Sequence, residues 1–431
     1  MSLTERRSID LHEAWLPQEH PLHRPRHGGR QRLALVCAAI FFAAPTLMLS
    51  FGVRAAEFEN RPLTSFPSVS SGWATLTGLP AWAEDHLPFR DVAVRTSGGI
   101  SHGIFGEPAP LPEGDGPPSP PIGPVVPVPA PTESDRMPPS AFPSVIEGKD
   151  GWLYLGSDIS GACAPDRTLD QVLASITQLR DAVEDSGRRF ELIVVPNKTT
   201  MVPENLPEDY VGADCADLAT DEFWRRVVPE ADAIDLRPPL RDAAERKGAP
   251  VYYPADTHWS HEGGLVLTYA LAEEMSPGVT RTWQIAPTGD IPWPDDISPL
   301  IGRSGERRID TYSLASDGKT DRTQHAVSDF RVPLGFRSTP IAGTVDTSVR
   351  MIADSFTQFA SRYLAASFTD ISIMHLETAG GAPKRAGTFL ARGDVVVVEV
   401  AERHLVSGSS PILLQPVIDG VRAELAKQPV S

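Results

Sequence analysis

Cysteine is scarce in this chain of 431 residues, which contains only Cys37, Cys163 and Cys215. None of the three has the short C-x-x-C spacing of a metal site, so no cysteine-based metal centre is predicted. Cys37 lies in an apolar segment described below. Cys163 and Cys215 remain, either as a disulfide if this part of the chain is exported or as two free thiols. The sequence leaves both alternatives open because it does not give the distance between them.

Positive charge is also in short supply. The formal net charge is -17 at pH 7 and the isoelectric point is about 5.1. A broad nucleic-acid-binding surface is basic, so no nucleic-acid partner is predicted. No internal repeat and no phosphate-binding glycine loop is present, and no cofactor is expected. Hydrophobic residues make up 41% of the chain, enough for one large or two modest domains.

Long hydrophobic runs are limited to one, LALVCAAIFFAAPTLMLSFGV at residues 33–53, which carries no charge. It is long enough to cross a bilayer as a transmembrane helix. Residues 1–32 are polar and rich in Arg and His, which predicts a disordered tail on the cytoplasmic side and an extracellular domain after Val53. A cleaved signal peptide with Val53-x-Ala55 as its cleavage site is the alternative, which the length of the apolar region disfavours.

Proline, in contrast, is abundant, with 42 residues, many of them in the block 107–142. Proline fixes φ and removes a backbone donor, so this block is predicted to be an extended, mobile linker. Residues 54–106 mix apolar and charged side chains and are predicted to be an ordered juxtamembrane segment. The main domain is predicted to begin near Pro143 and to extend over residues 143–431.

Within this domain, strand and helix patterns alternate. Val145 to Leu155 predicts a hairpin with its turn at 149–151. Apolar runs with strand character lie at 190–195, 251–254, 351–352, 371–375 and 395–400. Helical spacing of apolar residues lies at 169–186, 223–228, 240–247, 264–275, 355–366 and 411–427. This order predicts an α/β fold with a mostly parallel sheet that is covered on both faces.

Residues 276–350 break this alternation. They are polar and rich in Gly, Pro, Asp and Ser, with only a weak strand pattern at 311–315 and 330–333. We interpret them as a loop-rich insertion that can cover a site.

The stretch Tyr253 to Gly264 carries the strongest chemical signal. Asp256 and His258 are two residues apart, so in extended backbone they point to the same side. Asp256 can then hold the imidazole in one tautomer and leave the other nitrogen free as a base. Ser355 is the candidate nucleophile. Asp256 and Ser355 both follow predicted strands, which places them at the carboxyl edge of the sheet, where sites form.

Two other interpretations of this stretch remain open. His258 with Asp256 or His261 can belong to a metal site, which needs further ligands, and none with suitable spacing is near. Alternatively, the stretch is a helix start, with Ser260 as N-cap and Glu262 in the first turn. A helix start explains Ser260 onward but not Asp256 and His258.

In their order along the chain, several motifs resemble the alginate O-acetyltransferase family, the AlgX/AlgJ-like branch of the SGNH hydrolases. They cover most of residues 54–410, and the family usually has Gly where this chain has Ala353. The matching segments are Glu59-Asn60-Arg61, Asp85 to Arg90, Gly148 to Leu153, Pro196-Asn197-Lys198, Asp256 to Trp259, Asp354-Ser355-Phe356 and Glu399 to Arg403.

The resemblance implies an SGNH-hydrolase-like three-layer fold with a circularly permuted motif order, because the Asp and the His precede the Ser. It implies Asp256 as the orienting carboxylate, His258 as the base and Ser355 as the nucleophile. It also implies transfer of acetyl groups to hydroxyls of an extracytoplasmic polysaccharide, with a membrane-bound O-acyltransferase as the partner that supplies acetyl. A carbohydrate acetylesterase using the same triad and a non-catalytic scaffold for polysaccharide export are the alternatives.

Other residues near these motifs have candidate roles. The backbone N–H groups of Ser355 and Phe356 open a predicted helix and are candidates for an oxyanion hole. Asn197 and Lys198 follow a strand, either as substrate contacts or as a turn residue and a surface lysine.

Two further pairs of residues are predicted to be structural. Glu399 and Arg403 are predicted to form an ion pair outside the chemistry. Trp152 and Trp259 are predicted to be buried, although both can in principle stack on sugar rings.

Overall fold

A computed structural model describes residues 141–324 and 330–430, together with 33–39 and the positions 43, 48, 66, 75, 79, 82–83 and 86. Most of the predicted tail, transmembrane helix, juxtamembrane segment and proline-rich linker therefore lies outside the described residues. Residues 33–39 are helical. Within the described residues, no helix combines the length and the apolar character needed to span a bilayer. The chain divides into two compact units, 1–94 and 95–431, and the second contains the candidate site.

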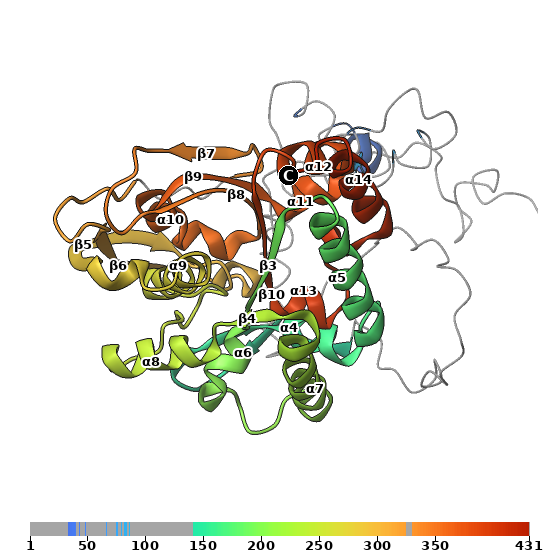
Figure 1. The fold of residues 1–431 in the computed structure, drawn as a ribbon. Coiled ribbons are helices and arrows are strands. Elements are labelled where there is room, and N and C mark those ends of the chain that lie inside the picture. Colours follow the sequence, from blue (N-terminus) through green and yellow to red (C-terminus); the bar gives the residue numbers. More distant parts are fainter. Residues whose placement is uncertain are drawn as a thin grey trace, which may run out of the picture. The chain divides into compact units, whose positions relative to one another are not determined.

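The second unit is built on a sheet with strand order β4-β3-β10-β8-β9-β7 (Figure 1). The first five strands pair in parallel and β7 pairs antiparallel with β9 at the edge. This confirms the predicted α/β fold with a mostly parallel sheet. The strands are β3 (Arg189–Val195), β4 (Ala233–Asp235), β7 (Leu334–Arg337), β8 (Val345–Ala353), β9 (Phe368–His375) and β10 (Val395–Ala401).

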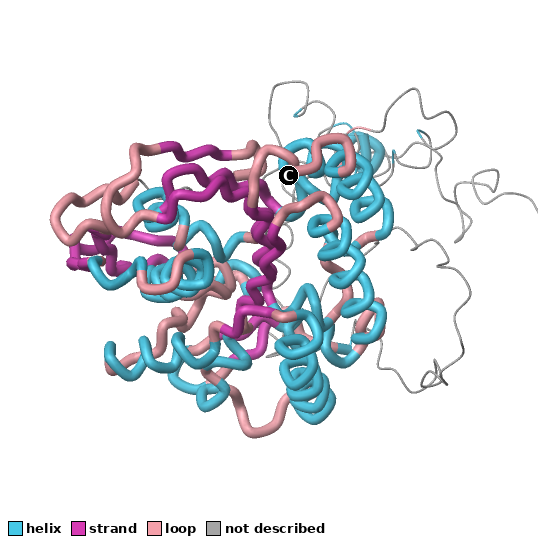
Figure 2. Tube along the Cα trace, viewed as in Figure 1, coloured by secondary structure: helices cyan, strands magenta, loops and turns pink. Residues whose placement is uncertain are grey.

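Alternate residues of the central strands enter two separate cores, because successive side chains of a strand point to opposite faces. In β8, Met351 belongs to one core and Ile352 to the other. Helices cover both faces of the sheet (Figure 2). Helices α9 (His261–Met275) and α10 (Ser361–Ser367) contribute to the first core, and α5 (Leu169–Glu184), α12 (Pro383–Leu390) and α14 (Gln415–Leu425) to the second.

The predicted hairpin near the start of the domain is present. Strands β1 (Val145–Glu147) and β2 (Leu153–Leu155) pair antiparallel around the turn Lys149–Gly151. Asp150 and Gly151 both have positive φ there, 52° and 79°, a conformation that glycine and aspartate tolerate.

A disulfide joins two of the helices that follow. Cys163, the last residue of α4 (Gly156–Cys163), is bonded to Cys215 in the first turn of α7 (Ala213–Ala231). Their Cα atoms are 5.3 Å apart, within the usual range for a disulfide. Of the two alternatives for these cysteines, the structure has the bonded one.

The insertion is more ordered than its composition indicates. It contains an antiparallel hairpin of β5 (Gln284–Pro294) and β6 (Glu306–Ala315) and then the edge strand β7. The predicted strand at 311–315 lies in β6, but 330–333 is not a strand. The hairpin was missed because most β5 side chains are exposed, so its residues need no apolar alternation.

One predicted strand is wrong. Residues 251–254 form only a single bridge, between Tyr252 and Trp259. The segment folds back on its own continuation as a loop instead of joining the sheet. The predicted helix at 355–366 is a 3-10 turn, Ser355–Phe359, followed by α10.

The remaining elements connect these layers. They are the helices α6 (Lys198–Met201), α8 (Arg237–Lys247), α11 (Leu376–Gly381) and α13 (Glu402–Val406), and the 3-10 turns Pro203–Asn205, Val279–Thr282, Ser298–Ile301 and Pro411–Leu413.

Candidate active site

The loop between α8 and α9, residues 251–260, holds Asp256 and His258, and we call it the base loop. Its ends are joined by the hydrogen bond from the Ser260 N–H to the Val251 carbonyl, at 2.6 Å. The indole N–H of the fully buried Trp259 donates to the carbonyl of Phe356 at 3.1 Å. The base loop is therefore fastened to the turn that follows β8. Burial of Trp259 agrees with the packing role predicted for it.

A close approach of backbone brings the same two segments together. A Cβ atom on Gly264, in the first turn of α9, would lie 2.2 Å from the carbonyl oxygen of Phe359. Only glycine fits at this position without displacing one segment from the other. The pair of glycines after His261 and Glu262 thus has a packing reason.

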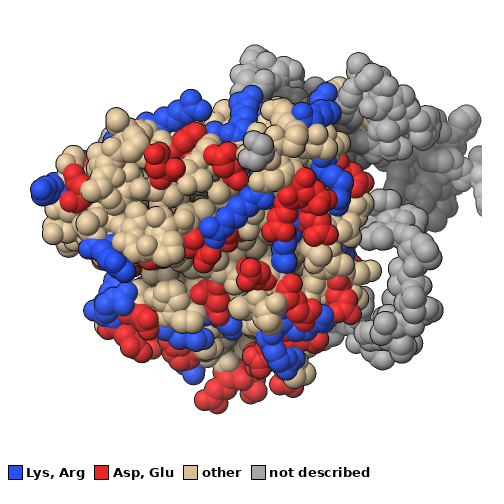
Figure 3. All heavy atoms as spheres, in the orientation of Figure 1, with Lys and Arg blue, Asp and Glu red and all other residues tan. Residues whose placement is uncertain are grey.

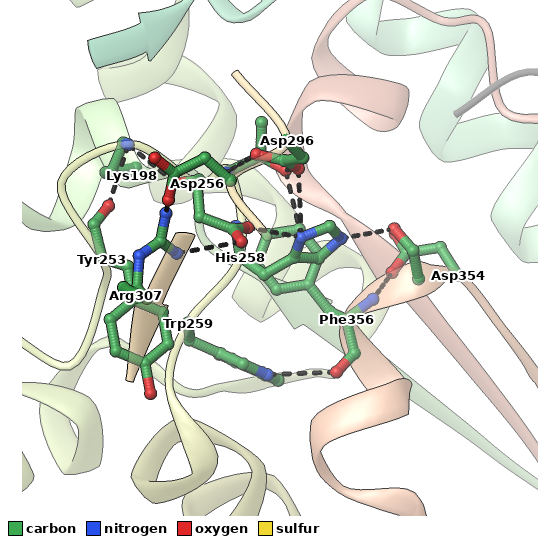
Figure 4. A network of polar contacts seen from close by, with 12 residues as sticks. Lys198, Tyr253, Asp256, His258, Trp259, Asp296, Arg307, Asp354 and Phe356 are labelled. Carbon is green, nitrogen blue, oxygen red and sulfur yellow. Dashed lines mark hydrogen bonds and ion pairs between the residues drawn. The ribbon is translucent and has the colours of Figure 1, made fainter. Parts of the chain in front are cut away.

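Three side chains meet where the base loop touches this turn, and Figure 4 shows two of them, Asp256 and His258. His258 Nδ1 lies 2.8 Å from Asp256 Oδ1, and His258 Nε2 lies 2.8 Å from Ser355 Oγ. The backbone N–H of His258 donates to the same Asp256 oxygen at 2.9 Å. Asp256 and His258 are buried, whereas Ser355 is half-buried. Both contacts are shorter than the roughly 4 Å that an unliganded triad tolerates.

Asp256 reaches this position by a different route from the one the sequence indicated. Asp256 does not follow a strand of the sheet. The base loop, which connects α8 to α9, places it beside the turn that follows β8. Ser355 does follow β8, as predicted.

The turn after β8 is held by the carboxylate of Asp354. Its Oδ1 accepts the Phe356 N–H at 2.9 Å and its Oδ2 accepts the Ala401 N–H at 2.7 Å. The prediction that Phe356 contributes to an oxyanion hole is therefore wrong in this geometry, because its N–H is already used to cap the turn. The backbone N–H of Ser355 remains the candidate from this turn.

The side chain of Glu399 supports the same turn through hydrogen bonds. It is fully buried, and its Oε2 accepts the Asp354 N–H at 2.8 Å and the Thr357 hydroxyl at 3.0 Å. Burial, followed by the charge of Asp354, raises the pKa of Glu399 well above its ordinary value. Among the described contacts Glu399 has no ion pair with Arg403, so the predicted pairing is wrong.

Lys198 is buried, not a surface lysine. Its Nζ donates to the carbonyls of Tyr253, Pro254 and Asp256 at 3.1, 3.0 and 2.7 Å. Burial lowers its pKa to about 7, although the charges of Asp296 and Asp256 oppose this shift. All three donors of the ammonium group are used on the base loop, so the structure favours support of that loop over substrate contact.

Asn197 is buried beside it and connects the carboxyl ends of the neighbouring strands β3 and β10. Its Oδ1 accepts the Arg403 N–H at 3.2 Å, and its own N–H donates to Glu402 at 2.9 Å. Asn197 is therefore more than a turn residue, and its predicted substrate contact stays a prediction. Trp152 is half-buried, with the Lys198 ammonium 5.7 Å from its ring centroid.

The sequence analysis missed Asp296, which lies between β5 and β6. Its Oδ2 is 3.2 Å from His258 Nδ1, and its Oδ1 accepts the Thr257 N–H at 2.8 Å. The Thr257 hydroxyl also donates to Asp296. Two carboxylates therefore face the same imidazole nitrogen, one from the base loop and one from the insertion.

The sequence analysis also missed Arg307, which lies in β6. Its Nη1 donates to Asp256 Oδ2 at 3.0 Å, and its other terminal nitrogen forms an ion pair with Asp295. Asp256 is thus held between the histidine and a guanidinium. Neither Asp296 nor Arg307 stood out in the sequence, where an acidic pair and a basic pair lie in a polar segment without periodicity.

The two carboxylates determine how His258 titrates. Burial lowers the pKa of His258, but its hydrogen bonds to Asp256 and Asp296 and their charges outweigh burial and raise the pKa to about 9. At neutral pH the resting imidazole is therefore largely protonated. As a general base it must first lose this proton, so a reaction that uses it speeds up as the pH rises toward 9.

Replacing Asp296 by asparagine is expected to lower the His258 pKa, because it removes the negative charge of one of the two carboxylates that face Nδ1. The acidic limb of the kcat/KM profile should then move down by about one to two pH units. The profile with nitrophenyl acetate measures this shift. Asp242→Asn, an exposed carboxylate on α8, is the matched control. An unchanged acidic limb would show that Asp296 does not act on the imidazole.

Asp256, His258 and Asp296 also form the one described cluster whose ligand atoms could hold a metal ion, all within 4.8 Å of one another. Asp296 supplies the third ligand that the sequence did not offer, and His261 is not part of the cluster. Two observations disfavour a cation here. The ligand nitrogen, His258 Nδ1, is within hydrogen-bonding distance of Asp256, and Arg307 already brings a positive charge to Asp256.

Comparison with known proteins confirms the resemblance to the alginate O-acetyltransferase family. Residues 145–288 match a family model described as SGNH hydrolase-like domain, acetyltransferase AlgX. The probable alginate O-acetylase AlgJ of Pseudomonas syringae pv. tomato is 34% identical over 171 residues, which are 37% of this chain and 43% of that protein. The protein of the same name from Pseudomonas fluorescens is 29% identical over 134 residues, 31% of this chain and 34% of that protein. The chain thus matches less than half the length of these relatives.

Solved structures with similar folds include the O-acetyltransferase domain of Pseudomonas putida AlgJ. It has 19% identity and a TM-score of 0.42, with 61% of this chain and 93% of that chain covered. Pseudomonas aeruginosa AlgX has 13% identity and a TM-score of 0.43, with 64% of this chain and 66% of that chain covered.

Proposed function

We propose that this protein is an O-acetyltransferase that acetylates hydroxyl groups of a polysaccharide through a covalent acyl-enzyme. The observation that carries the proposal is the continuous hydrogen-bonded series from Asp256 through His258 to Ser355, with 2.8 Å at each step. Such a series activates a serine hydroxyl as a nucleophile. The match to acetyltransferase domains supports acetyl as the transferred group.

In the first half of the reaction, Ser355 Oγ attacks the carbonyl carbon of an acetyl donor. His258 Nε2 takes the hydroxyl proton, and Asp256 and Asp296 stabilise the imidazolium that forms. The tetrahedral intermediate then collapses, the bond to the donor's leaving group breaks, and His258 gives its proton to that leaving group. The product is an acetyl ester on Ser355.

In the second half, an acceptor hydroxyl attacks the acetyl carbon of this ester. His258 Nε2 removes the hydroxyl proton as the new carbon–oxygen bond forms. The bond to Ser355 Oγ breaks and the proton passes back to the serine. An acetylated saccharide leaves, and the free enzyme is restored. If water takes the place of the sugar, the same steps give acetate, which is the acetylesterase alternative.

We place this chemistry outside the cytoplasm. The disulfide between Cys163 and Cys215 supports an oxidising compartment, and the apolar run at 33–53 supports a membrane anchor with its N-terminus in the cytoplasm. A membrane-bound O-acyltransferase that delivers acetyl across the bilayer is the partner that this arrangement requires, because acetyl must reach a domain on the far side.

The partition of acetyl between sugar and water tests the proposal. The purified full chain is given nitrophenyl acetate with an increasing concentration of an oligosaccharide. Nitrophenol reports every turnover and free acetate reports hydrolysis, so acetate per nitrophenol should fall while acetylated sugar appears in equal amount. Nitrophenol release with acetate as the constant product would establish the esterase. No enzyme-dependent nitrophenol release would favour the scaffold.

A further inference from the structure

Trp293 is a half-buried aromatic side chain in a strand whose other side chains are mostly exposed. It lies near the end of β5, where Ile285 is the other half-buried side chain. The ring of Trp293 packs against the ring of Phe359 in the turn after β8, with their centroids 5.2 Å apart. Phe359 is only 1% exposed, and its ring lies 5.8 Å from the ring of His258. One aromatic ring therefore separates Trp293 from the histidine of the triad.

The β5–β6 hairpin connects Trp293 to the triad a second time. Trp293 in β5 lies opposite Arg307 in β6, so the two side chains are on the same face of the hairpin. Arg307 donates to the triad carboxylate of Asp256 at 3.0 Å. The packing on Phe359 and the pairing with Arg307 are independent observations, and both place Trp293 beside the triad.

The indole N–H of Trp293 is not used within the protein. The buried Trp259 and Trp283 donate their N–H groups to the carbonyls of Phe356 and Gly343, at 3.1 and 2.7 Å. Within residues 141–324 and 330–430, the N–H of Trp293 has no such acceptor, and it is not among the buried side-chain groups that lack a partner. The N–H therefore reaches the surface, where a ligand can accept a hydrogen bond from it.

Ile291 extends the accessible apolar surface on the same face of the hairpin. It lies two residues before Trp293, so both side chains point to the same side of β5. Ile291 is 36% exposed, whereas Ile309, opposite it in β6, is fully buried. The other face of the hairpin carries an exposed ion pair between Arg308 and Asp290, at 2.6 Å. Strand β5 thus presents charge on one face and an accessible apolar surface on the face beside the triad.

A sugar ring has the chemistry that matches this surface. The C–H groups on one face of a pyranose are weakly positive, and the face of an aromatic ring is negative, so the two stack favourably. The hydroxyl groups at the edge of the sugar can accept a hydrogen bond from the indole N–H. Ligand sites commonly combine such an aromatic contact with a few polar groups that fix orientation.

We infer that Trp293 is the stacking platform of an acceptor subsite, on which a sugar ring of the saccharide binds beside the triad. This inference rests on the proposed transferase function and adds the side chain that holds the acceptor. Stacking on an indole recognises the C–H face of a sugar, so it does not demand a charged one. On the face shown in Figure 3, Lys and Arg side chains are interspersed with Asp and Glu, without a continuous basic region for a polyanion.

Binding of a saccharide to the full Ser355→Ala chain, measured by calorimetry, tests the platform without any reaction. The probes are cellopentaose, a neutral sugar, and an oligomannuronate of the same length. Trp293→Leu keeps an aliphatic contact for Phe359 but has no aromatic face, so Kd should rise about 5- to 100-fold, as for the loss of one aromatic stacking contact. Trp293→Phe keeps a ring and should lose less. Ile285→Ala, which shortens the other half-buried side chain of β5, is the matched control and should leave Kd unchanged.

A second measurement uses the chain with Ser355 intact and nitrophenyl acetate as the donor. Acetylated sugar and free acetate arise from the same acyl-enzyme, so their ratio does not depend on how fast that acyl-enzyme forms. Trp293→Leu should raise the acceptor concentration for half-maximal transfer by a factor similar to its rise in Kd. Damage to the position of His258 would slow both products alike, so this ratio separates binding of the acceptor from support of the triad.

The outcomes separate the platform from the proposed transferase. If neither probe binds the parent chain, or if Trp293→Leu binds both as tightly as the parent, the ring serves packing alone and the inference is wrong. An equal loss of binding in Ile285→Ala would also overturn it, because a disturbed hairpin would then be the cause. Binding lost only in the Trp293 variants, with no sugar acetylated by the parent enzyme, would keep the platform and reject the transferase. Acetylated sugar with an unchanged half-maximal concentration in Trp293→Leu would keep the transferase and reject the platform.

Discussion

Ser355→Ala is expected to abolish release of nitrophenol from nitrophenyl acetate, with a loss on the order of 10⁴- to 10⁶-fold in kcat. Among the residues that the structure describes, this hydroxyl is the only nucleophile that His258 Nε2 contacts, at 2.8 Å. Without it no acetyl-enzyme forms, so transfer and hydrolysis disappear together. A rapid-quench experiment followed by mass spectrometry should find the acetyl adduct on the wild-type chain and none on the variant.

A control separates loss of chemistry from loss of fold. Ser304→Ala removes an exposed hydroxyl from the connection between β5 and β6 and should leave both activities unchanged. Ser355→Ala removes a half-buried hydroxyl, so its melting temperature should stay within a few degrees of the wild type. If the variant is folded and still turns over, neither enzymatic function survives and the scaffold is the better description.

The central residues of the site were predictable from local sequence because triad chemistry requires few residue types. Asp256 and His258 are close along the chain, and a serine after a buried strand is where a nucleophile is usual. Their contact nevertheless arises differently from the prediction. The base loop is held by Lys198 and Trp259, and neither contact has a signature in the residues around Asp256.

The supporting residues were not predictable, because their contacts come from tertiary structure. Thr257 and Asp296 are 39 residues apart, and Arg307 reaches Asp256 across 51 residues from an exposed hairpin. Composition identified that region as polar but not as part of the site. Phe356 was misassigned for a local reason: an N–H at a helix start is free unless the preceding residue caps it, and Asp354 does.

Asp256→Asn is expected to cost about 10²- to 10³-fold in kcat/KM, less than the roughly 10⁴-fold known for this change in a Ser-His-Asp triad. An amide cannot serve both neighbours that the carboxylate serves. If its oxygen accepts from His258, its NH₂ group faces the donor Nη1 of Arg307, 3.0 Å from the present oxygen. If it turns over, the NH₂ group donates to Nδ1 and stabilises the tautomer that has no base at Nε2.

Asp296 is the reason for expecting the smaller loss, since its Oδ2 lies 3.2 Å from Nδ1 and can still accept that proton. The double variant Asp256→Asn/Asp296→Asn should therefore fall at least about tenfold further, toward the 10⁴-fold loss. Both single variants should shift the acidic limb of the pH profile to lower pH, because each removes a negative charge that raises the His258 pKa. Steady-state kinetics of the four proteins with nitrophenyl acetate measure the cycle, with Asp242→Asn as control. If the double variant equals Asp256→Asn, the second carboxylate does not support the base and Asp256 alone orients His258.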